Sequence, residues 1–323
     1  MAPISVTVAI CTWNRAELLR RTLQSFLLID VPGDTDWRLL VVNNNSSDQT
    51  ESVVRQFTDR LPIRSAFESM AGLSNARNRA LDEAGSDYVL FTDDDVLVSR
   101  RWLDAFATAA RRYPDAAAFG GPIEPWFVVE PDPDLAAAFP NLQLGFCGVD
   151  HHVPEGSISD RPDIETDNLI YGANMAFATR ALAALRFNPA IGAVHDRPML
   201  GDETFLVRKL RERGDSIIWV PEMRVKHYVE PARMTLEYLL SYYEGIGRTH
   251  VKLHGRAEAA TLFGAPRWLH RKRAEAGVKW VWHTVRHRRV QALEALREYS
   301  YYTGMMKEYR EPPVPVPERH VTV

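Results

Sequence analysis

The amino-acid sequence predicts an α/β protein in which helices flank a mostly parallel sheet and a helical appendage follows at the C-terminus. In the N-terminal third, short β-branched apolar runs alternate with amphipathic stretches, which is the order of a sheet with right-handed crossover helices. Polar clusters follow three of the predicted strands. From about Leu236 onward the chain turns helical and aromatic. Together these features favour a sheet domain followed by a helical region.

Composition narrows the class of protein further. The 323 residues carry a net charge of -3 at pH 7, so the overall charge gives no reason to expect nucleic-acid binding. Two cysteines, Cys11 and Cys147, are too few for a disulfide framework. No uninterrupted apolar stretch reaches the roughly 18 residues of a membrane span. We expect a cytoplasmic protein, and peripheral attachment to the inner face of a membrane stays open.

The first part of the sheet is predicted from apolar periodicity. Each strand is a short apolar run suited to a sheet covered on both faces, and the four strands are residues 6–11, 37–42, 63–67 and 88–92. Asn14 is the expected N-cap of the first helix, whose apolar stripe consists of Leu19, Leu23, Phe26 and Leu27. Two further helices are predicted, one around Val53, Val54 and Phe57 and one at residues 73–84.

The middle of the chain is less regular. A helix is expected after Ser99, and short strands at residues 116–121 and 216–220. Residues 122–165 contain many prolines and scattered aromatic side chains, so we expect an irregular segment there. An irregular stretch of this length inside a compact domain is more often functional than idle.

Three consecutive carboxylates, Asp93, Asp94 and Asp95, end the fourth predicted strand. Carboxylates so close together repel one another, and a bound cation would relieve that repulsion. The alternative is an acidic turn before the helix that begins near Ser99. Polar clusters around Thr12 and Asn43 would lie along the same sheet edge and complete a crevice.

The crevice lacks the usual phosphate-binding loops. Neither GxGxxG nor GxxxxGK[ST] occurs among the predicted strands and helices. A phosphate ligand would therefore need a metal and an arginine to bind it. The three carboxylates and Arg77 could supply them.

Four ordered blocks of sequence resemble those of family 2 glycosyltransferases with the GT-A fold. The blocks are residues 8–15, 41–50, 72–78 and 91–95. The resemblance implies a nucleotide-sugar site that includes Thr12, Asn14, Arg15, Asn43, Asn44, Arg77, Asp93 and Asp94. It also implies that Asp93 and Asp95 form the metal-binding DxD pair. The family often has aspartate where this chain has Asn43, so the resemblance does not decide which nucleobase the donor carries. UDP is the favoured nucleotide, with GDP and dTDP as alternatives.

Later blocks extend the resemblance to residue 230 or so. Gly172 and Asn174 lie in a segment similar to one that approaches the donor sugar and acceptor. Asp202 and Glu203 resemble the catalytic carboxylate block in reversed order, and helix capping is the alternative explanation for them. Either could be the base; by register it is Glu203. His227 is the third expected ligand of a Mn²⁺ or Mg²⁺ ion, since oxygen ligands with at most one imidazole suit these metals.

The C-terminal region differs in composition from the rest. Residues 266–289 contain eight lysines and arginines, one acid and three tryptophans. Such a segment can lie on an anionic membrane surface, or it can belong to a helical bundle whose tryptophans pack on the catalytic domain while its arginines stay solvated. We predict a catalytic domain at 1–230, a helical region at 231–311 and a flexible tail at 312–323. We expect no nucleic-acid partner.

The predicted activity is inverting, metal-dependent transfer of a sugar from a nucleotide-diphosphate donor to the hydroxyl of a carbohydrate, lipid-linked or small-molecule acceptor. It would serve polysaccharide, glycolipid or glycoconjugate biosynthesis. One alternative is a sugar-nucleotide pyrophosphorylase, but residues 12–15 do not form the Gly-rich loop that such an enzyme needs. Another is a non-catalytic carbohydrate- or nucleotide-binding protein, although the acids needed for catalysis are present.

Overall fold

A computed structural model describes residues 3–143, 148–164, 169–183, 185–189, 202–256 and 259–311. The chain divides into two compact units. The sheet unit comprises Met1–Pro131, Pro140–Phe187 and Glu203–Pro231, and the helical unit comprises Asp132–Phe139, Asn188–Asp202 and Ala232–Val323. The predicted tail, residues 312–323, lies outside the described residues.

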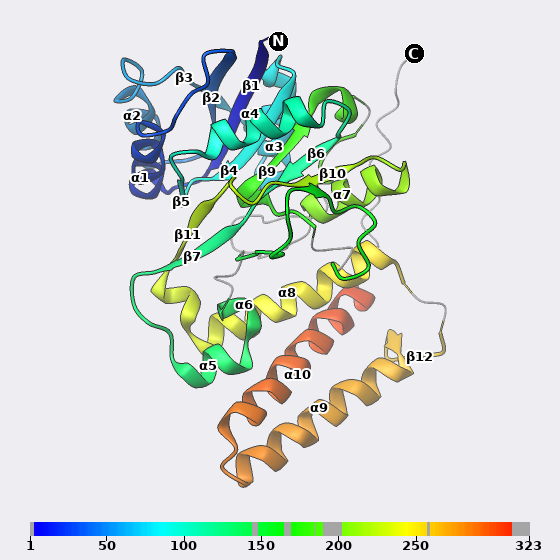
Figure 1. Cartoon of the computed structure of the whole chain (residues 1–323). Coiled ribbons are helices and arrows are strands. Elements are labelled where there is room, and N and C mark those ends of the chain that lie inside the picture. The colour runs from blue at the N-terminus through cyan, green and yellow to red at the C-terminus, as the bar shows by residue number, and fades with distance from the viewer. Residues whose placement is uncertain are drawn as a thin grey trace. The chain divides into compact units, whose positions relative to one another are not determined.

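An eight-stranded, mostly parallel sheet forms the centre of the sheet unit (Figure 1), which confirms the predicted fold class. The first half runs β3 (Ile63–Phe67), β2 (Thr35–Asn43), β1 (Ile4–Thr12) and β4 (Tyr88–Asp93), and neighbours pair in parallel. The second half runs β9 (Met175–Ala178), β6 (Ala118–Gly120), β10 (Ile217–Trp219) and β8 (Gly156–Ser157). Of these strands, β9 is antiparallel to β4 and β6, and β8 is antiparallel to β10.

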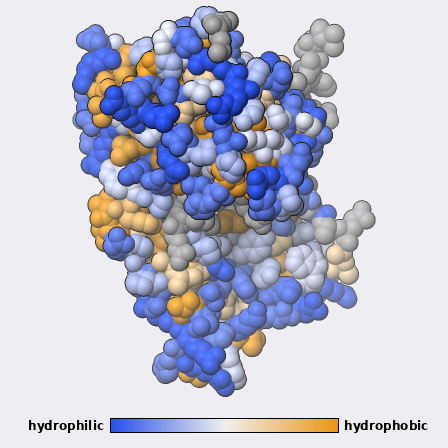
Figure 2. Space-filling model, viewed as in Figure 1, coloured by the Kyte–Doolittle hydropathy of each residue, from blue (hydrophilic) through white to orange (hydrophobic). Residues whose placement is uncertain are grey.

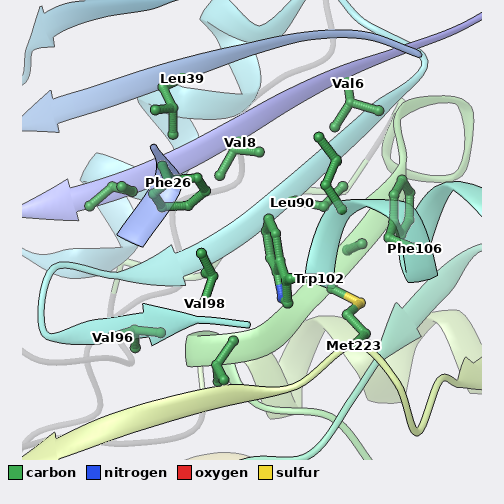
Figure 3. Packing of buried hydrophobic residues seen from close by; sticks show 14 of the residues in the cluster. Val6, Val8, Phe26, Leu39, Leu90, Val96, Val98, Trp102, Phe106 and Met223 are labelled. Atoms are coloured by element: carbon green, nitrogen blue, oxygen red, sulfur yellow. The ribbon is translucent and has the colours of Figure 1, made fainter. Parts of the chain in front are cut away.

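Two hydrophobic clusters cover the two faces of the sheet. Alternate residues of β1 point to opposite faces, so Val8 enters one cluster and Ala9 the other. Helices α1 (Ala16–Phe26), α2 (Thr50–Arg55) and α4 (Trp102–Arg112) pack on the Val8 side, and α3 (Leu73–Ala84) and α7 (Asp202–Glu212) pack on the Ala9 side. The ring centroids of Phe26 and Trp102 are 5.9 Å apart, with the rings edge to face. Figure 3 shows both side chains among the residues of this cluster, with Phe26 beside Val8. Burial on both faces explains why the strands are continuously apolar.

A second, three-stranded sheet was not predicted from the sequence. It consists of β5 (Val96–Val98), β11 (Val225–Val229) and β7 (Ile123–Phe127) in the order β5-β11-β7. In it, β11 is antiparallel to β5 and parallel to β7, and His227 lies opposite Val96. The pairing brings β11 beside the strand that directly follows the acidic triplet.

Two sequence-based expectations were wrong in detail. Asn14 does not cap α1; its N-cap residue is Arg15, and the amide of Ala16 donates to Asp48 Oδ2 instead. Residues 122–165 are not wholly irregular, because β7 and β8 lie within them together with α5 (Pro133–Ala138) and α6 (Pro140–Gln143). Short 3-10 helices occur at Gly172–Asn174, Thr179–Leu182 and Pro231–Met234.

Three long helices make up most of the described part of the helical unit: α8 (Leu236–His254), α9 (Arg267–Val285) and α10 (Arg289–Arg310). A small hairpin of β12 (Thr261–Leu262) and β13 (Ala265–Pro266) precedes α9. Glycines allow α8 and α10 to approach closely, since a Cβ at Gly304 would lie 1.9 Å from the carbonyl oxygen of Glu244. Among the described residues, no helix is long and apolar enough to cross a membrane.

Candidate active site

The acidic triplet lies at the carboxyl end of β4, in the turn that leads into β5. One ligand atom from each of Asp93, Asp95 and His227 can be chosen so that all three atoms lie within 4.8 Å of one another. His227 Nε2 is 3.3 Å from Asp95 Oδ1 and 3.9 Å from Asp93 Oδ2. The pairing of β11 with β5 carries His227 to this position from a part of the chain far from the triplet in sequence.

Asp94 faces a different set of partners. The hydroxyl of Thr12 donates to Asp94 Oδ2 over 2.6 Å. Arg15 Nη1 donates to Asp94 Oδ1 over 3.2 Å and to Asp95 Oδ2 over 2.8 Å. The expectation for Thr12 and Arg15 was a nucleotide contact; in the structure both side chains donate hydrogen bonds to the acidic turn. Asp94 is thereby tied to the end of β1 and the start of α1.

The electrostatics of the turn follow from burial and crowding. Burial, together with the neighbouring charge of Asp95, raises the pKa of Asp94 to about 7, although the opposing charge of Arg15 lowers it. Burial also raises the pKa of Asp93, while Arg77 and His227 oppose the shift and Asp95 adds to it. Burial alone would lower the pKa of Arg15, but the carboxylates of Asp94 and Asp95 raise it above its ordinary value. Burial thus disfavours the ionised forms of Asp93 and Asp94 in this turn.

The donor set of this turn fits a hard divalent cation. Two carboxylates and one imidazole converge, and Asp95 and His227 are each only a few per cent exposed. Oxygen donors with a single imidazole suit Mg²⁺ and Mn²⁺, whereas soft metals prefer thiolates. The added positive charge would favour the ionised carboxylates that burial disfavours.

Arg77 connects the acidic turn to Glu203. Its Nη2 is 3.8 Å from Asp93 Oδ1 and its Nη1 is 3.4 Å from Glu203 Oε2. The guanidinium is almost fully buried, over the ring of Phe187 at 5.5 Å. A Cβ at Gly172 would lie 2.0 Å from Arg77 Nη2, so only glycine leaves room for this arginine. Glu203 is thus brought beside a triplet more than a hundred residues away.

Glu203 stands in the first turn of α7. The side chain of Asp202, the competing choice for the base, lies outside the described residues. An ion pair with Arg77 keeps Glu203 close to the turn and is compatible with the ionised form that a general base requires.

The asparagines of the first two blocks join loops to one another. Asn14, at a φ of 53°, accepts from the amide of Ser47 through Oδ1. Asn43 accepts from the amide of Ser46 and donates to Glu51 Oε1. Asn44 accepts from the amide of Gly72 and donates to the carbonyl oxygens of Glu68 and Met70. These bonds fix the loops that follow β1, β2 and β3.

Asn174 differs from its predicted role. Its side chain is completely buried, its Oδ1 accepts from Trp102 Nε1, and its Nδ2 donates to the carbonyl oxygens of Pro122 and Met223. Both amide hydrogens are used inside the protein, so this geometry offers no contact to a sugar hydroxyl. Asn174 instead ties β9 to α4 and to the segments before β7 and β11.

Thr22 is a site residue that the sequence reasoning missed. Its hydroxyl donates to the carbonyl oxygen of Asp94 and accepts from the amide of Val96, so it holds the backbone of the acidic turn. The only signal in the sequence is its position: Thr22 lies within the apolar stripe of α1, between Leu19 and Phe26, and is buried with them. A polar side chain in an apolar stripe needs a partner.

The fold and the site define a class: an α/β protein in which carboxylates that could hold a metal stand at the carboxyl end of a mostly parallel sheet. Residues 7–126 match the family model of glycosyl transferase family 2. The succinoglycan biosynthesis protein ExoM of Rhizobium meliloti is 25% identical over 265 residues, which is 79% of each chain. The glucosyl-dolichyl phosphate glucuronosyltransferase of Haloferax volcanii is 22% identical over 253 residues, 76% of each chain.

Solved structures share the fold at low identity. The mannosyltransferase PcManGT of Pyrobaculum calidifontis, in complex with GDP-Man and Mn²⁺, superposes with a TM-score of 0.55 at 20% identity, over 80% of this chain and 67% of that one. Residues 1–349 of S. aureus TarS, in complex with UDP, superpose with a TM-score of 0.56 at 14% identity, over 91% of this chain and 89% of that one. The family-model match over residues 7–126, the named relatives and the shared fold together support a glycosyltransferase of family 2 with the GT-A fold. The resemblance found in the sequence is confirmed for family, fold and enzyme class.

Proposed function

We propose that this glycosyltransferase is metal-dependent and inverting, and that it moves a sugar from a nucleotide-diphosphate donor to an acceptor hydroxyl. The observation that carries the proposal is the convergence of Asp93, Asp95 and His227, with Glu203 joined to the same turn through Arg77. Relatives named for succinoglycan biosynthesis and for poly(ribitol-phosphate) modification support a role in polysaccharide, glycolipid or glycoconjugate synthesis.

Asp93, Asp95 and His227 would hold Mn²⁺ or Mg²⁺, whose positive charge would stabilise the negative charge that develops on a departing diphosphate. Glu203 would accept the proton of the acceptor hydroxyl while that oxygen forms its bond to the anomeric carbon. The bond from that carbon to the diphosphate breaks on the opposite face, so the configuration inverts. Arg77 would hold the carboxylates of Glu203 and Asp93 in fixed positions relative to each other through its two ion pairs.

The donor would lie among Thr12, Asn14, Arg15, Asn43, Asn44, Asp94 and Gly172. UDP is the favoured nucleotide, with GDP and dTDP as alternatives; solved structures of the same fold hold GDP-Man, UDP and UDP-GlcNAc. Asn43 Oδ1 already accepts from Ser46, so a base N–H would have to share that oxygen. The acceptor would be a carbohydrate, a lipid-linked sugar or a small molecule. We place the reaction in the cytoplasm and propose peripheral membrane contact through residues 266–289.

A donor panel tests this function. Purified protein would be incubated with UDP-, GDP- and dTDP-sugars, with and without Mn²⁺, and the released nucleoside diphosphate measured. We expect release from one nucleotide class, dependent on the metal. A protein that neither binds nor turns over any of these donors would contradict the proposal, and release of pyrophosphate from a nucleoside triphosphate and a sugar 1-phosphate would favour the pyrophosphorylase alternative.

A further inference from the structure

Helix α9 carries an apolar face that the described residues of the helical unit leave exposed. Val278, Val281, Trp282 and Val285 are 70, 56, 53 and 73% exposed. Their spacing of three and four residues places them on one side of the helix. Four large apolar side chains grouped in this way are unlike the singly scattered apolar residues of an ordinary protein surface.

The opposite side of α9 is the one that packs inside the unit. Leu269 and Ala276 are buried, and the guanidinium of Arg273 lies over the ring of Tyr299 of α10 at 4.3 Å. Gly277 faces the same ring, since a Cβ there would lie 3.6 Å from it. The side of α9 that packs inside the unit therefore does not include the four exposed apolar residues. We call these four residues, Val278, Val281, Trp282 and Val285, the outer face.

Positive charge surrounds the outer face. Residues 267–288 contain seven lysines and arginines and a single acid, Glu275. Arg286 lies over the ring of Trp282, with its Cζ 3.8 Å from the ring centroid. Within the described part of the chain, Arg267, Arg286 and Arg288 form no ion pair with a carboxylate. At the tip where α9 ends and α10 begins (Figure 1), the visible surface is mostly hydrophilic with small hydrophobic areas among the charged side chains (Figure 2).

Charge decides which partner fits this face. A second copy docking through α9 would bring two strongly basic helices together, with one acid on each to offset the repulsion. An anionic lipid surface can instead bind both the apolar and the basic side chains of α9. Valine and tryptophan enter the boundary between headgroups and acyl chains, and the arginines reach the lipid phosphates. We propose that the outer face of α9 docks on the anionic headgroups of a bilayer, with the helix lying in the plane of the interface.

This proposal refines the membrane contact put forward with the function to four apolar side chains and their flanking arginines, Arg286 and Arg288. It does not depend on the donor, the metal or the base. If the protein binds vesicles but transfers no sugar, only the proposed function is contradicted. If it transfers sugar but does not bind vesicles, only the docking is contradicted.

Vesicle co-sedimentation of the full chain tests the docking. We expect binding to vesicles of phosphatidylcholine with phosphatidylglycerol, little binding to phosphatidylcholine alone, and release at high salt. The triple variant Val278→Ser, Trp282→Ser, Val285→Ser should bind about tenfold more weakly or not at all. The double variant Arg286→Gln, Arg288→Gln should bind roughly 30-fold more weakly, because each arginine adds to the attraction of the anionic surface. Leu28→Ser, which changes a side chain 71% exposed in the sheet unit, should bind as wild type does.

Circular dichroism would establish that the variants keep their helices, and donor hydrolysis would show that the sheet unit is intact. Equal binding to both vesicle types, absence of binding by the wild type, or unchanged binding of the triple variant would overturn the proposal. So would a wild-type oligomer, measured by light scattering, that the triple variant converts to a monomer without any effect of vesicles.

Discussion

Single side chains decide how the candidate active site is assembled, and Glu203 shows this most clearly. Its carboxylate is 3.4 Å from Arg77, which in turn faces Asp93. We expect Glu203→Gln to keep nucleotide binding and lose transfer by about 10² to 10⁴-fold, the usual contribution of a general base. Donor affinity by calorimetry and transfer rate would be measured together.

Glu212→Gln is a matched control, because Glu212 lies on the same helix, pairs with Lys209 and is half exposed. It should leave transfer unchanged. If Asp202→Asn shows the loss and Glu203→Gln does not, the assignment of the base is wrong.

Arg77 is the second residue with a testable positioning role. Lysine keeps the charge but has no planar fork, so Arg77→Lys cannot hold Asp93 and Glu203 at once. We expect kcat to fall by about 10 to 100-fold, with a smaller change in the KM of the donor, as when a reacting group is misplaced. Arg79→Lys is the control, since Arg79 pairs with Glu83 on the exposed side of the same helix. Equal kinetics for Arg77→Lys and wild type would contradict the role.

At the scale of elements, close packing of α8 on α10 depends on glycine. A Cβ at Gly304 would lie 1.9 Å from a backbone oxygen of α8, and backbone cannot move aside as a side chain can. We expect Gly304→Ala to destabilise the helical unit by about 1 to 3 kcal/mol, because the cost of overpacking exceeds the stabilisation that the higher helix propensity of alanine provides. Thermal unfolding followed by circular dichroism measures the change.

Gly277→Ala provides the comparison within the same unit. The added methyl group would meet the Tyr299 ring at 3.6 Å, an ordinary contact. Alanine has the higher helix propensity, so this variant should be neutral or more stable by up to about 1 kcal/mol. Equal destabilisation of both variants would show that the close approach at Gly304 does not control the stability of the unit, and the packing argument would fail.

At the scale of the molecule, the metal site links distant parts of the chain. Asp93 and Asp95 flank the end of β4, and His227 comes from β11, so the ligands meet only in the folded protein. An ion that binds the folded form raises its stability by mass action, about 2.7 kcal/mol at a hundredfold excess over Kd. We expect Mn²⁺ to raise the Tm of the wild type and a chelator to reverse the increase.

Asp95→Asn and His227→Ala should weaken Mn²⁺ binding by about tenfold or more and reduce that rise in Tm. Asp94→Asn is the matched control: Asp94 is held by Thr12 and Arg15 and lies outside the proposed ligand set, so the Mn²⁺-dependent rise should persist. A loss of the rise in Asp94→Asn that equals the loss in Asp95→Asn would contradict the assignment of ligands.

Much of the sheet unit could be predicted from local patterns. The helix expected at residues 73–84 forms as α3 (Leu73–Ala84), and the strands expected at 63–67 and 88–92 form as β3 and β4 with at most one residue of difference. Hydrophobic periodicity and flanking glycines are properties of neighbouring residues, so the sequence displays them directly. The short β5 gave no such signal, because three residues are too few to show a period.

The sequence by itself determined the alternation of strands and helices, the acidic triplet at a strand end and the family to which these blocks belong. Only the tertiary structure decided that His227 meets Asp95, that Arg77 joins Asp93 to Glu203, and that Asn174 is buried among backbone carbonyls. The contacts of His227 with Asp95, of Arg77 with Glu203 and of Asn174 with Pro122 join residues more than fifty positions apart. Such distances depend on how β11 pairs with β5 and how the helices pack on the sheet, and local residue patterns do not encode them.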